Sequence, residues 1–184
     1  MGYLFVVTGR KGSGKTSSCL YVLNQAITAS IRVGGVLEVR STHPVTRGYD
    51  LLDCGTGRRI RLASLHRPSA AWFRPPGHGY WFSREALDVA NSILLALERS
   101  RPPLAIVDEV GTLEMEGGGL YKGLCSVLKL TDTAPTVTIV SCRAGAAEWL
   151  YGNLARGLSK EIWSPGMPSE LWARVRFRLV ELRD

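Results

Sequence analysis

The sequence predicts an α/β fold of three layers, in which helices cover both faces of a mostly parallel central sheet that carries an antiparallel β-hairpin insertion. Short apolar runs of strand length alternate with longer amphipathic segments along the 184 residues, which is the pattern of repeated βα units. One apolar run leads into a glycine-rich loop, and another ends in two acids. We expect a single domain over residues 1–184, with the hairpin insertion at about 36–82.

The bulk composition is that of a globular protein with a basic surplus. Hydrophobic residues make up 45% of the chain, the net charge is +7 and the calculated pI is near 9.5. No apolar run approaches the roughly 18 residues of a membrane span, and the N-terminus lacks the features of a secretory signal. The four cysteines are scattered without a C-x-x-C pair. We therefore expect a cytoplasmic protein with reduced thiols and no membrane association.

The first half of the chain is predicted to hold most of the strands. An apolar strand at 3–8 precedes the glycine loop, and a helix follows it. The double glycine Gly34-Gly35 is expected to break the chain, and the turn at 54–57 is a hairpin signal. The expected elements are a strand at 3–8, a helix at 15–30, and strands at 36–40, 47–54 and 58–64.

The second half is predicted to alternate between helices and buried strands. The segment 66–79 is a proline- and glycine-rich loop, and Ser83 can cap the helix after it. The apolar run 104–107 reads as a central strand. The remaining elements are expected as helices at 84–99, 120–130 and 146–156, a strand at 136–140, a loop around 163–166, a short helix opened by Pro168, and a final strand at 174–182.

The phosphate-binding pattern G-x-x-x-x-G-K-[ST] occupies residues 9–16. Its glycines let the backbone curl so that successive N–H groups point at anionic oxygens, and the following helix adds its positive N-terminal end. Lys15 can then reach the β- and γ-phosphates, and the Thr16 hydroxyl can bind Mg²⁺. The strand before the loop and the helix after it are the context that this motif needs. The predicted phosphate-binding residues are Gly9, Arg10, Lys11, Gly12, Ser13, Gly14, Lys15, Thr16 and Ser17.

Asp108 and Glu109 end the predicted central strand. Ligands bind at the carboxyl ends of the strands in open α/β sheets, so both acids are expected beside the phosphate loop. We expect Asp108 to support Mg²⁺ opposite Thr16, and Glu109 to orient and deprotonate a water aimed at the γ-phosphorus. Glu109 and Lys15 are the predicted catalytic residues. A solvated acidic turn is the other interpretation of the pair, and the phosphate loop upstream favours the functional one.

Three further side chains each keep two interpretations. Glu114 either acts near the metal and the water or is an acid at a helix N-terminus. Arg143, after the strand at 136–140, either contacts the γ-phosphate or lies on the surface. Trp163 either flanks a nucleotide base together with Pro165 or packs against the core.

The basic surplus also has two interpretations. Arg59 and Arg61 alternate with apolar residues, and so do the arginines of 174–178. Such alternation is typical of the solvated face of edge strands, where charge discourages pairing with other chains. A nucleic-acid surface is the less favoured interpretation. Part of the excess can also complement a triphosphate.

Together these motifs resemble the cancer-related nucleoside-triphosphatase family. The family form T-G-x-x-G-x-G-K-T is matched by residues 8–16, and the stretch G-x-x-x-x-E-V-R is similar to residues 34–40. Residues 47–50 resemble an R-x-G-F-D-like element with one position absent, and residues 107–114 are similar to the acidic motif I-D-E-I-G-K-M-E. The resemblance covers about residues 3–143.

Membership in that family implies a RecA-like sheet with an antiparallel hairpin. It also implies Mg²⁺-dependent hydrolysis of nucleoside triphosphates to diphosphate and phosphate, with broad base tolerance. Thr112 departs from the family pattern, which usually has lysine at that position. If that lysine neutralises phosphate charge, Arg47 or Arg143 is a candidate to replace it.

The sequence thus predicts a P-loop NTPase that uses Mg²⁺ and hydrolyses ATP, GTP and related triphosphates by in-line attack of water. A nucleotide or nucleoside kinase is the first alternative, in which an acceptor replaces water and the arginines of 58–74 form a lid. A nucleotide-dependent switch that binds RNA, DNA or a protein is the second alternative, suggested by the basic surplus and the loop at 66–79. The absence of an N-K-x-D motif argues against strict guanine selectivity, and the oligomeric state is not predicted.

Overall fold

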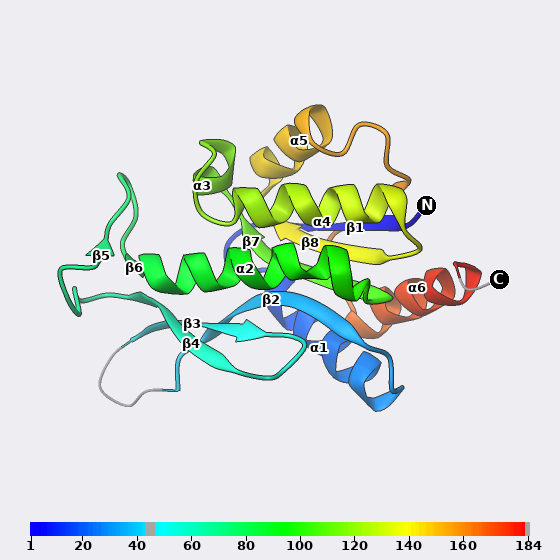
Figure 1. Ribbon diagram of the computed structural model, residues 1–184, viewed down its shortest axis with the longest axis horizontal. Helices are drawn as coiled ribbons and strands as arrows, with labels where there is room; N and C mark the ends of the chain where they lie inside the picture. Colours follow the sequence, from blue (N-terminus) through cyan, green and yellow to red (C-terminus); the bar gives the residue numbers. More distant parts are fainter. Residues whose placement is uncertain (43–46, 183–184) are drawn as a thin grey trace.

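The computed structural model describes residues 1–42 and 47–182, so a small part of the predicted insertion and the last two positions of the predicted domain lie outside the described residues. Strands and helices alternate along most of the chain (Figure 1). The strands are β1 (Tyr3–Thr8), β2 (Val33–Arg40), β3 (Gly48–Asp53), β4 (Arg59–Ser64), β5 (Trp72–Phe73), β6 (Trp81–Ser83), β7 (Leu104–Val110), β8 (Val137–Cys142) and β9 (Lys160–Trp163). The helices are α1 (Lys15–Thr28), α2 (Arg84–Ser100), α3 (Thr112–Met115), α4 (Tyr121–Thr133), α5 (Ala144–Asn153) and α6 (Pro168–Glu181).

The described strands form one sheet in the order β5-β6-β4-β3-β2-β7-β8-β1-β9. Strands β2, β7, β8, β1 and β9 pair in parallel. The pairs β2–β3, β3–β4, β4–β6 and β5–β6 are antiparallel. The sheet is therefore mixed, with a parallel half and an antiparallel half, whereas the sequence predicted a mostly parallel sheet.

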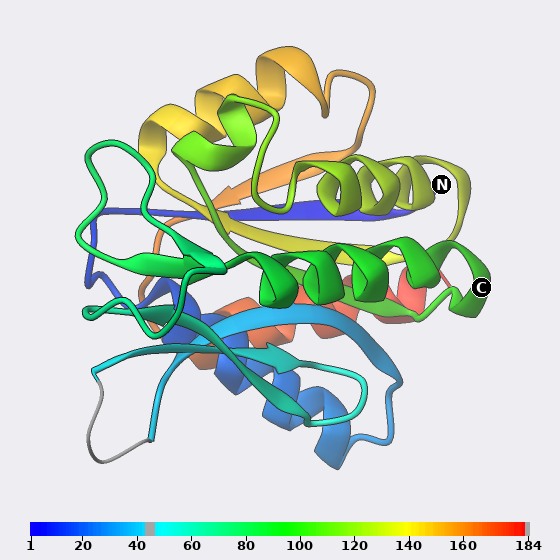
Figure 2. The same cartoon turned by 60° about the vertical axis from the view of Figure 1, so that its left-hand side comes forward.

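Helices cover both faces of this sheet (Figures 1 and 2). Helices α1 and α6 pack on one face in a core that includes Phe5 and Ile106. Helices α2, α4 and α5 pack on the other face in a core that includes Leu4 and Leu94. Because neighbouring residues of β1 enter opposite cores, this strand is buried on both faces, as its continuous apolar sequence predicted.

The antiparallel half is built on the predicted hairpin. The turn between β3 and β4 is closed by the Asp53 carboxylate, which accepts hydrogen bonds from the Gly55 amide at 2.9 Å and the Thr56 hydroxyl at 2.7 Å. The Gly34-Gly35 pair, expected to break the chain, lies inside β2 instead. Gly35 has a φ of 111°, and a Cβ there would lie 1.9 Å from the Ile106 carbonyl oxygen, so glycine is needed where β2 approaches β7.

The C-terminal region differs most from the sequence prediction. Residues 174–181 belong to helix α6 and not to a final strand. The alternation of arginine with apolar residues suggested a strand, but Leu171, Val175 and Leu179 are the buried residues and repeat every fourth position, which is the helical period. Strand β9 lies in a segment where no strand was predicted, because it is short and only partly buried.

Two smaller expectations are met. The Ser83 hydroxyl accepts a hydrogen bond from the Ala86 amide at 3.1 Å and so caps α2, as predicted. All four cysteines are free thiols. In the described part of the chain, no helix combines the length and the apolar character that crossing a membrane requires.

Candidate active site

The glycine loop connects the carboxyl end of β1 to the first turn of α1. Gly12 has a φ of 78° and Gly14 a φ of 95°, which is the left-handed region that residues with a Cβ rarely adopt. A Cβ at Gly9 would lie 2.6 Å from the Ser13 hydroxyl oxygen, so the loop also closes tightly on its first residue. Strand, loop and helix occur in the predicted order, and the loop leads directly into the amino end of α1.

Lys15 is the first residue of α1 and is buried, with 3% of its surface exposed. Its ammonium group donates hydrogen bonds to the carbonyl oxygens of Gly9 and Arg10, both at 3.2 Å. The side chain therefore folds back across the loop. This position keeps a positive charge against the first residues of the glycine loop.

Thr16 and Asp108 meet although they are 92 positions apart in the sequence. The Thr16 hydroxyl donates a hydrogen bond to the Asp108 carboxylate at 2.9 Å. The same carboxylate oxygen accepts a bond from the Glu38 amide of β2 at 3.2 Å. The predicted proximity of the loop to the acid is thus confirmed, and it follows from the parallel order β7-β8-β1, which brings the strand ends to one edge of the sheet.

A β-bulge at the end of β7 places the two acids. Val107 pairs with Val140 and Val110 pairs with Cys142, so Asp108 and Glu109 together face the single residue Ser141. Glu109 has a φ of 58°, a strained value for a residue with a side chain. A regular strand sends consecutive side chains to opposite faces, whereas a bulge re-aims one of them. The bulge therefore allows two adjacent acids to serve one site.

Ser141 fills this bulge. Its hydroxyl donates a short hydrogen bond to the second oxygen of the Asp108 carboxylate and accepts one from the Glu109 amide at 3.0 Å. Ser141 is not among the residues that the sequence predicted for the site. The available signal was a small polar side chain at the carboxyl end of a buried strand, two residues before Arg143.

The acids at this edge share a poorly solvated environment. Burial raises the pKa of the Asp108 carboxyl to about 6, even though hydrogen bonds from Ser141 and Thr16 act in the opposite direction. Burial also raises the pKa of the Glu38 carboxyl to about 8, and the negative charges of Asp108 and Glu109 add to this rise. The ionised carboxyls at this edge of the sheet are therefore poorly solvated, which favours binding of a cation beside them.

The contacts of Glu114 favour the interpretation that it is an acid at a helix N-terminus. Its carboxylate is buried and accepts hydrogen bonds from the Gly111 and Leu120 amides, both at 2.8 Å. It therefore joins the start of α3 to the start of α4, as an acid at a helix N-terminus would. Thr112, where the family usually has lysine, is exposed at the first position of α3.

The candidate cationic residues differ in their placement. Arg143 is exposed at the N-cap of α5, directly after β8, and so lies at the same edge of the sheet as Asp108. Arg47 is exposed just before β3. Arg10 and Lys11 are exposed in the loop, as is Ser17 in the first turn of α1.

Trp163 is half-buried and packs against the core under α1 and α6, which supports the packing interpretation of this side chain.

The Thr16 hydroxyl and the Asp108 carboxylate fit a magnesium site. Both are hard oxygen donors, which Mg²⁺ prefers, and they lie 2.9 Å apart beside the glycine loop. Within residues 1–42 and 47–182, no group of three or more His, Cys, Asp and Glu side chains is placed to bind a metal ion. Mg²⁺ does not need such a group, because it commonly uses one or two protein oxygens together with phosphate oxygens and water.

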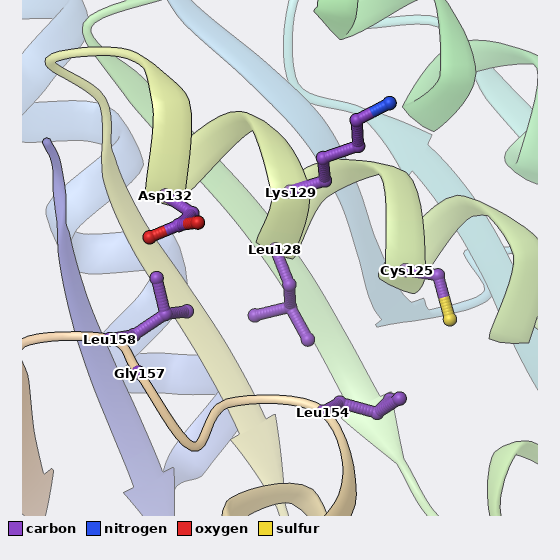
Figure 3. A pocket seen from close by; sticks show the side chains of 7 residues that line it. All are labelled: Cys125, Leu128, Lys129, Asp132, Leu154, Gly157 and Leu158. Carbon is purple, nitrogen blue, oxygen red and sulfur yellow. The ribbon is translucent and has the colours of Figure 1, made fainter.

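A separate cavity of about 270 Å³ lies between α4 and the segment that follows α5 (Figure 3). Leu128, Leu154 and Leu158 face one another in this cavity, while Lys129 extends away from it. None of its lining residues belongs to the glycine loop or to β7. The apolar cavity is therefore distinct from the loop and the acids.

A glycine loop that opens a helix, facing an acid on a nearby parallel strand, is typical of nucleotide-binding α/β proteins. A model of a family described as NTPase matches residues 4–154. The chain therefore belongs to this NTPase family, as the resemblance of its motifs implied.

Curated relatives and solved structures agree with this membership. The chain is 29% identical to the nucleoside-triphosphatase THEP1 of Pyrobaculum aerophilum over 179 residues, which cover 96% of this chain and 91% of the relative. It is 27% identical to THEP1 of Thermofilum pendens over 159 residues, covering 83% of this chain and 81% of the relative. The fold is similar to the solution structure of a human cancer-related nucleoside triphosphatase, with a TM-score of 0.65, 16% identity and 96% coverage of both chains. THEP1 from Aquifex aeolicus gives a TM-score of 0.61 at 14% identity, with 95% of this chain and 99% of that chain covered.

Proposed function

We propose that this protein is a RecA-like P-loop enzyme that hydrolyses nucleoside triphosphates to diphosphate and phosphate with the help of Mg²⁺. The observation that carries the proposal is the 2.9 Å contact between Thr16 and Asp108 beside the glycine loop. Membership in the NTPase family and the names of the relatives support the same reaction. The reaction class fits a loop whose positive groups converge where a polyphosphate would lie.

The residues of the chain take distinct roles in this proposal. The loop amides and the amino end of α1 bind the phosphate oxygens, and Lys15 turns from its carbonyl partners toward the β- and γ-phosphates. Thr16 and Asp108 hold Mg²⁺, which when bound neutralises charge on the phosphate oxygens. Glu109 accepts a hydrogen bond from the attacking water and orients it toward the γ-phosphorus. Ser141 fixes the positions of both acids.

Hydrolysis and phosphoryl transfer differ only in the group that attacks the γ-phosphorus. Glu109 lies next to Asp108 at the edge of the sheet, which favours a water molecule as the attacking group. A kinase would instead need a second binding site for the acceptor. Incubation with ATP and a mixture of nucleosides and nucleoside monophosphates separates the two reactions. Phosphorylated acceptor forming faster than free phosphate would replace the hydrolase proposal with the kinase.

The direct test is phosphate release from the common triphosphates, with Mg²⁺ and with excess EDTA. We expect release from several bases, loss of release in EDTA, and a fall of about 10²–10³-fold in Lys15→Ala. Lys129→Ala is the control, because it removes an exposed lysine from α4, outside the glycine loop, and should keep most of the activity. We expect Glu109→Gln to lower turnover about 100-fold while leaving nucleotide binding in place. Full activity in both Lys15→Ala and Glu109→Gln would refute the proposal.

A further inference from the structure

The antiparallel half of the sheet carries an unusual distribution of charge. Residues 54–84 contain six arginines, two histidines and no acidic residue. The same stretch contains five aromatic residues, at positions 72, 73, 80, 81 and 82. Most of the basic surplus of the chain is thus concentrated in one segment.

The part of this stretch after β4, residues 65–84, lies at the same end of the molecule as the glycine loop. Strand β6 pairs with β4 only at Ala63 and Ser64, and Ser64 also faces Gly48 at the start of β3. The start of β3 pairs with the carboxyl end of β2, which runs parallel to β7. Figures 1 and 2 show the segment projecting beside α3 at this end.

Arginine and aromatic side chains stack on one another in this segment. The guanidinium carbon of Arg67 lies 4.9 Å from the centroid of the Trp81 ring, and that of Arg74 lies 5.4 Å from the same ring. Arg84 lies 4.5 Å from the ring centroid of Phe73. The three arginines are exposed and the two rings are half-buried. Flat cationic and aromatic surfaces therefore lie against one another within residues 65–84.

We propose that residues 65–84 bind single-stranded nucleic acid, with the aromatic and guanidinium planes stacking on bases and the arginines contacting phosphates. Single strands expose the π-faces of their bases, and proteins bind them by combining aromatic side chains with a positively charged track. Charge complementarity favours this occupant, because a segment without any acid attracts a polyanion along its whole length. A base that displaces a guanidinium from Trp81 frees that arginine for the adjacent phosphate.

The test measures binding of a fluorescent oligouridylate of about 16 nucleotides by anisotropy, in EDTA and without nucleotide. Hydrolysis does not enter this measurement, so its outcome is separate from that of the proposed NTPase activity. We expect binding that weakens steeply with salt and a much lower affinity for a duplex of the same length. The double variant R67Q/R74Q should bind about tenfold more weakly and lower the salt slope by about 1.4, since each phosphate contact contributes about 0.7 for single strands.

The matched control is R58Q/R59Q, which removes two exposed arginines from the other end of β4 and changes the net charge equally. It should retain affinity for the oligonucleotide within about threefold, because these two arginines contribute only through their general positive charge. Trp81→Leu, with circular dichroism as a check of folding, should weaken binding about tenfold through loss of one stacking surface. Absence of binding at low salt, equal losses in the two arginine pairs, equal affinity for duplex, or displacement of the strand by ATP would each overturn the proposal.

Discussion

The two halves of the sheet place their charged residues in opposite ways. In the parallel half, strands such as β7 and β8 are buried along their length, and the acids Asp108 and Glu109 appear only where β7 ends. In the antiparallel half, the segment 54–84 carries arginines in the turn before β4, in β4 itself, in the loop after it and at the start of α2, and it contains no acid. Strands that are buried on both faces can carry charged residues only at their ends, so these residues form a motif that the sequence reveals. A partly exposed region can carry charged residues at many positions, and no motif results.

Removal of the central acid of the parallel half should have the largest effect. Asp108→Asn keeps the size of the side chain but removes the charge that supports the metal, so we expect turnover to fall about 10³-fold. The measurement is phosphate release at saturating Mg²⁺. Arg58→Gln in the antiparallel half is the control. It removes an exposed side chain and should change turnover less than about twofold. A comparable loss of turnover in both variants would contradict the expectation that hydrolysis depends on the parallel half alone.

A smaller loss is expected when the side chain in the bulge is shortened. Ser141→Ala removes hydrogen bonds to Asp108 and to the Glu109 amide, so both acids lose their fixed positions. Groups of this kind contribute about 10- to 100-fold to activity or metal affinity, and we expect a similar rise in the Mg²⁺ concentration needed for half-maximal rate.

The control for Ser141 is Ser126→Ala. Ser126 also donates to a carboxylate, that of Glu98 at 2.9 Å, but this pair joins α4 to α2. Its removal should lower thermal stability slightly and leave the Mg²⁺ dependence unchanged. An unchanged Mg²⁺ dependence in Ser141→Ala would show that the bulge does not position the acids.

The pH dependence of stability should also distinguish the halves. The folded-state pKa of Asp108 is about 6, above its ordinary value of 3.8, so the folded state holds this proton more tightly than the unfolded state. Its contribution to stability is full below pH 3.8 and is lost as the pH rises through 6. In EDTA, the unfolding free energy of Asp108→Asn should therefore rise relative to that of the native sequence as the pH increases from 4 to 7, by up to about 2–3 kcal/mol. The measurement is the melting temperature of both proteins across this pH range. A difference that is constant across this range would contradict the assigned burial of the charge.

The smallest effect is expected at the hairpin turn of the antiparallel half. Thr56→Ala removes the exposed hydrogen bonds of the Thr56 hydroxyl, which donates to the Asp53 carboxylate and accepts from the Arg58 amide, so the unfolding free energy should fall by about 0.5–1 kcal/mol. Phosphate release should stay the same. A measurable loss of activity would show that this turn communicates with the acids at the opposite end of the strands.

The sequence predicted the parts of the site that depend on local pattern. Lys15 and Thr16 follow from the glycine loop, and Asp108 follows from the buried strand before it. Ser141 could not be inferred, because its role depends on a register shift between two strands that are far apart in the chain. The sequence predicted a strand at 174–182 because arginine alternates with apolar residues there. The same stretch also has a helical period through Leu171, Val175 and Leu179, and packing against α1 favours the helix.

The chain of hydrogen bonds through the β7–β8 bulge makes one backbone amide a spectroscopic reporter. The Glu109 amide donates to the Ser141 hydroxyl, whose own proton points to Asp108. A change in proton or metal occupancy at that carboxylate must alter how strongly the hydroxyl is polarised, and hence how it accepts from the amide. The nitrogen and proton chemical shifts of residue 109 should therefore follow the titration of its neighbour, and NMR could read the state of this centre without any substrate.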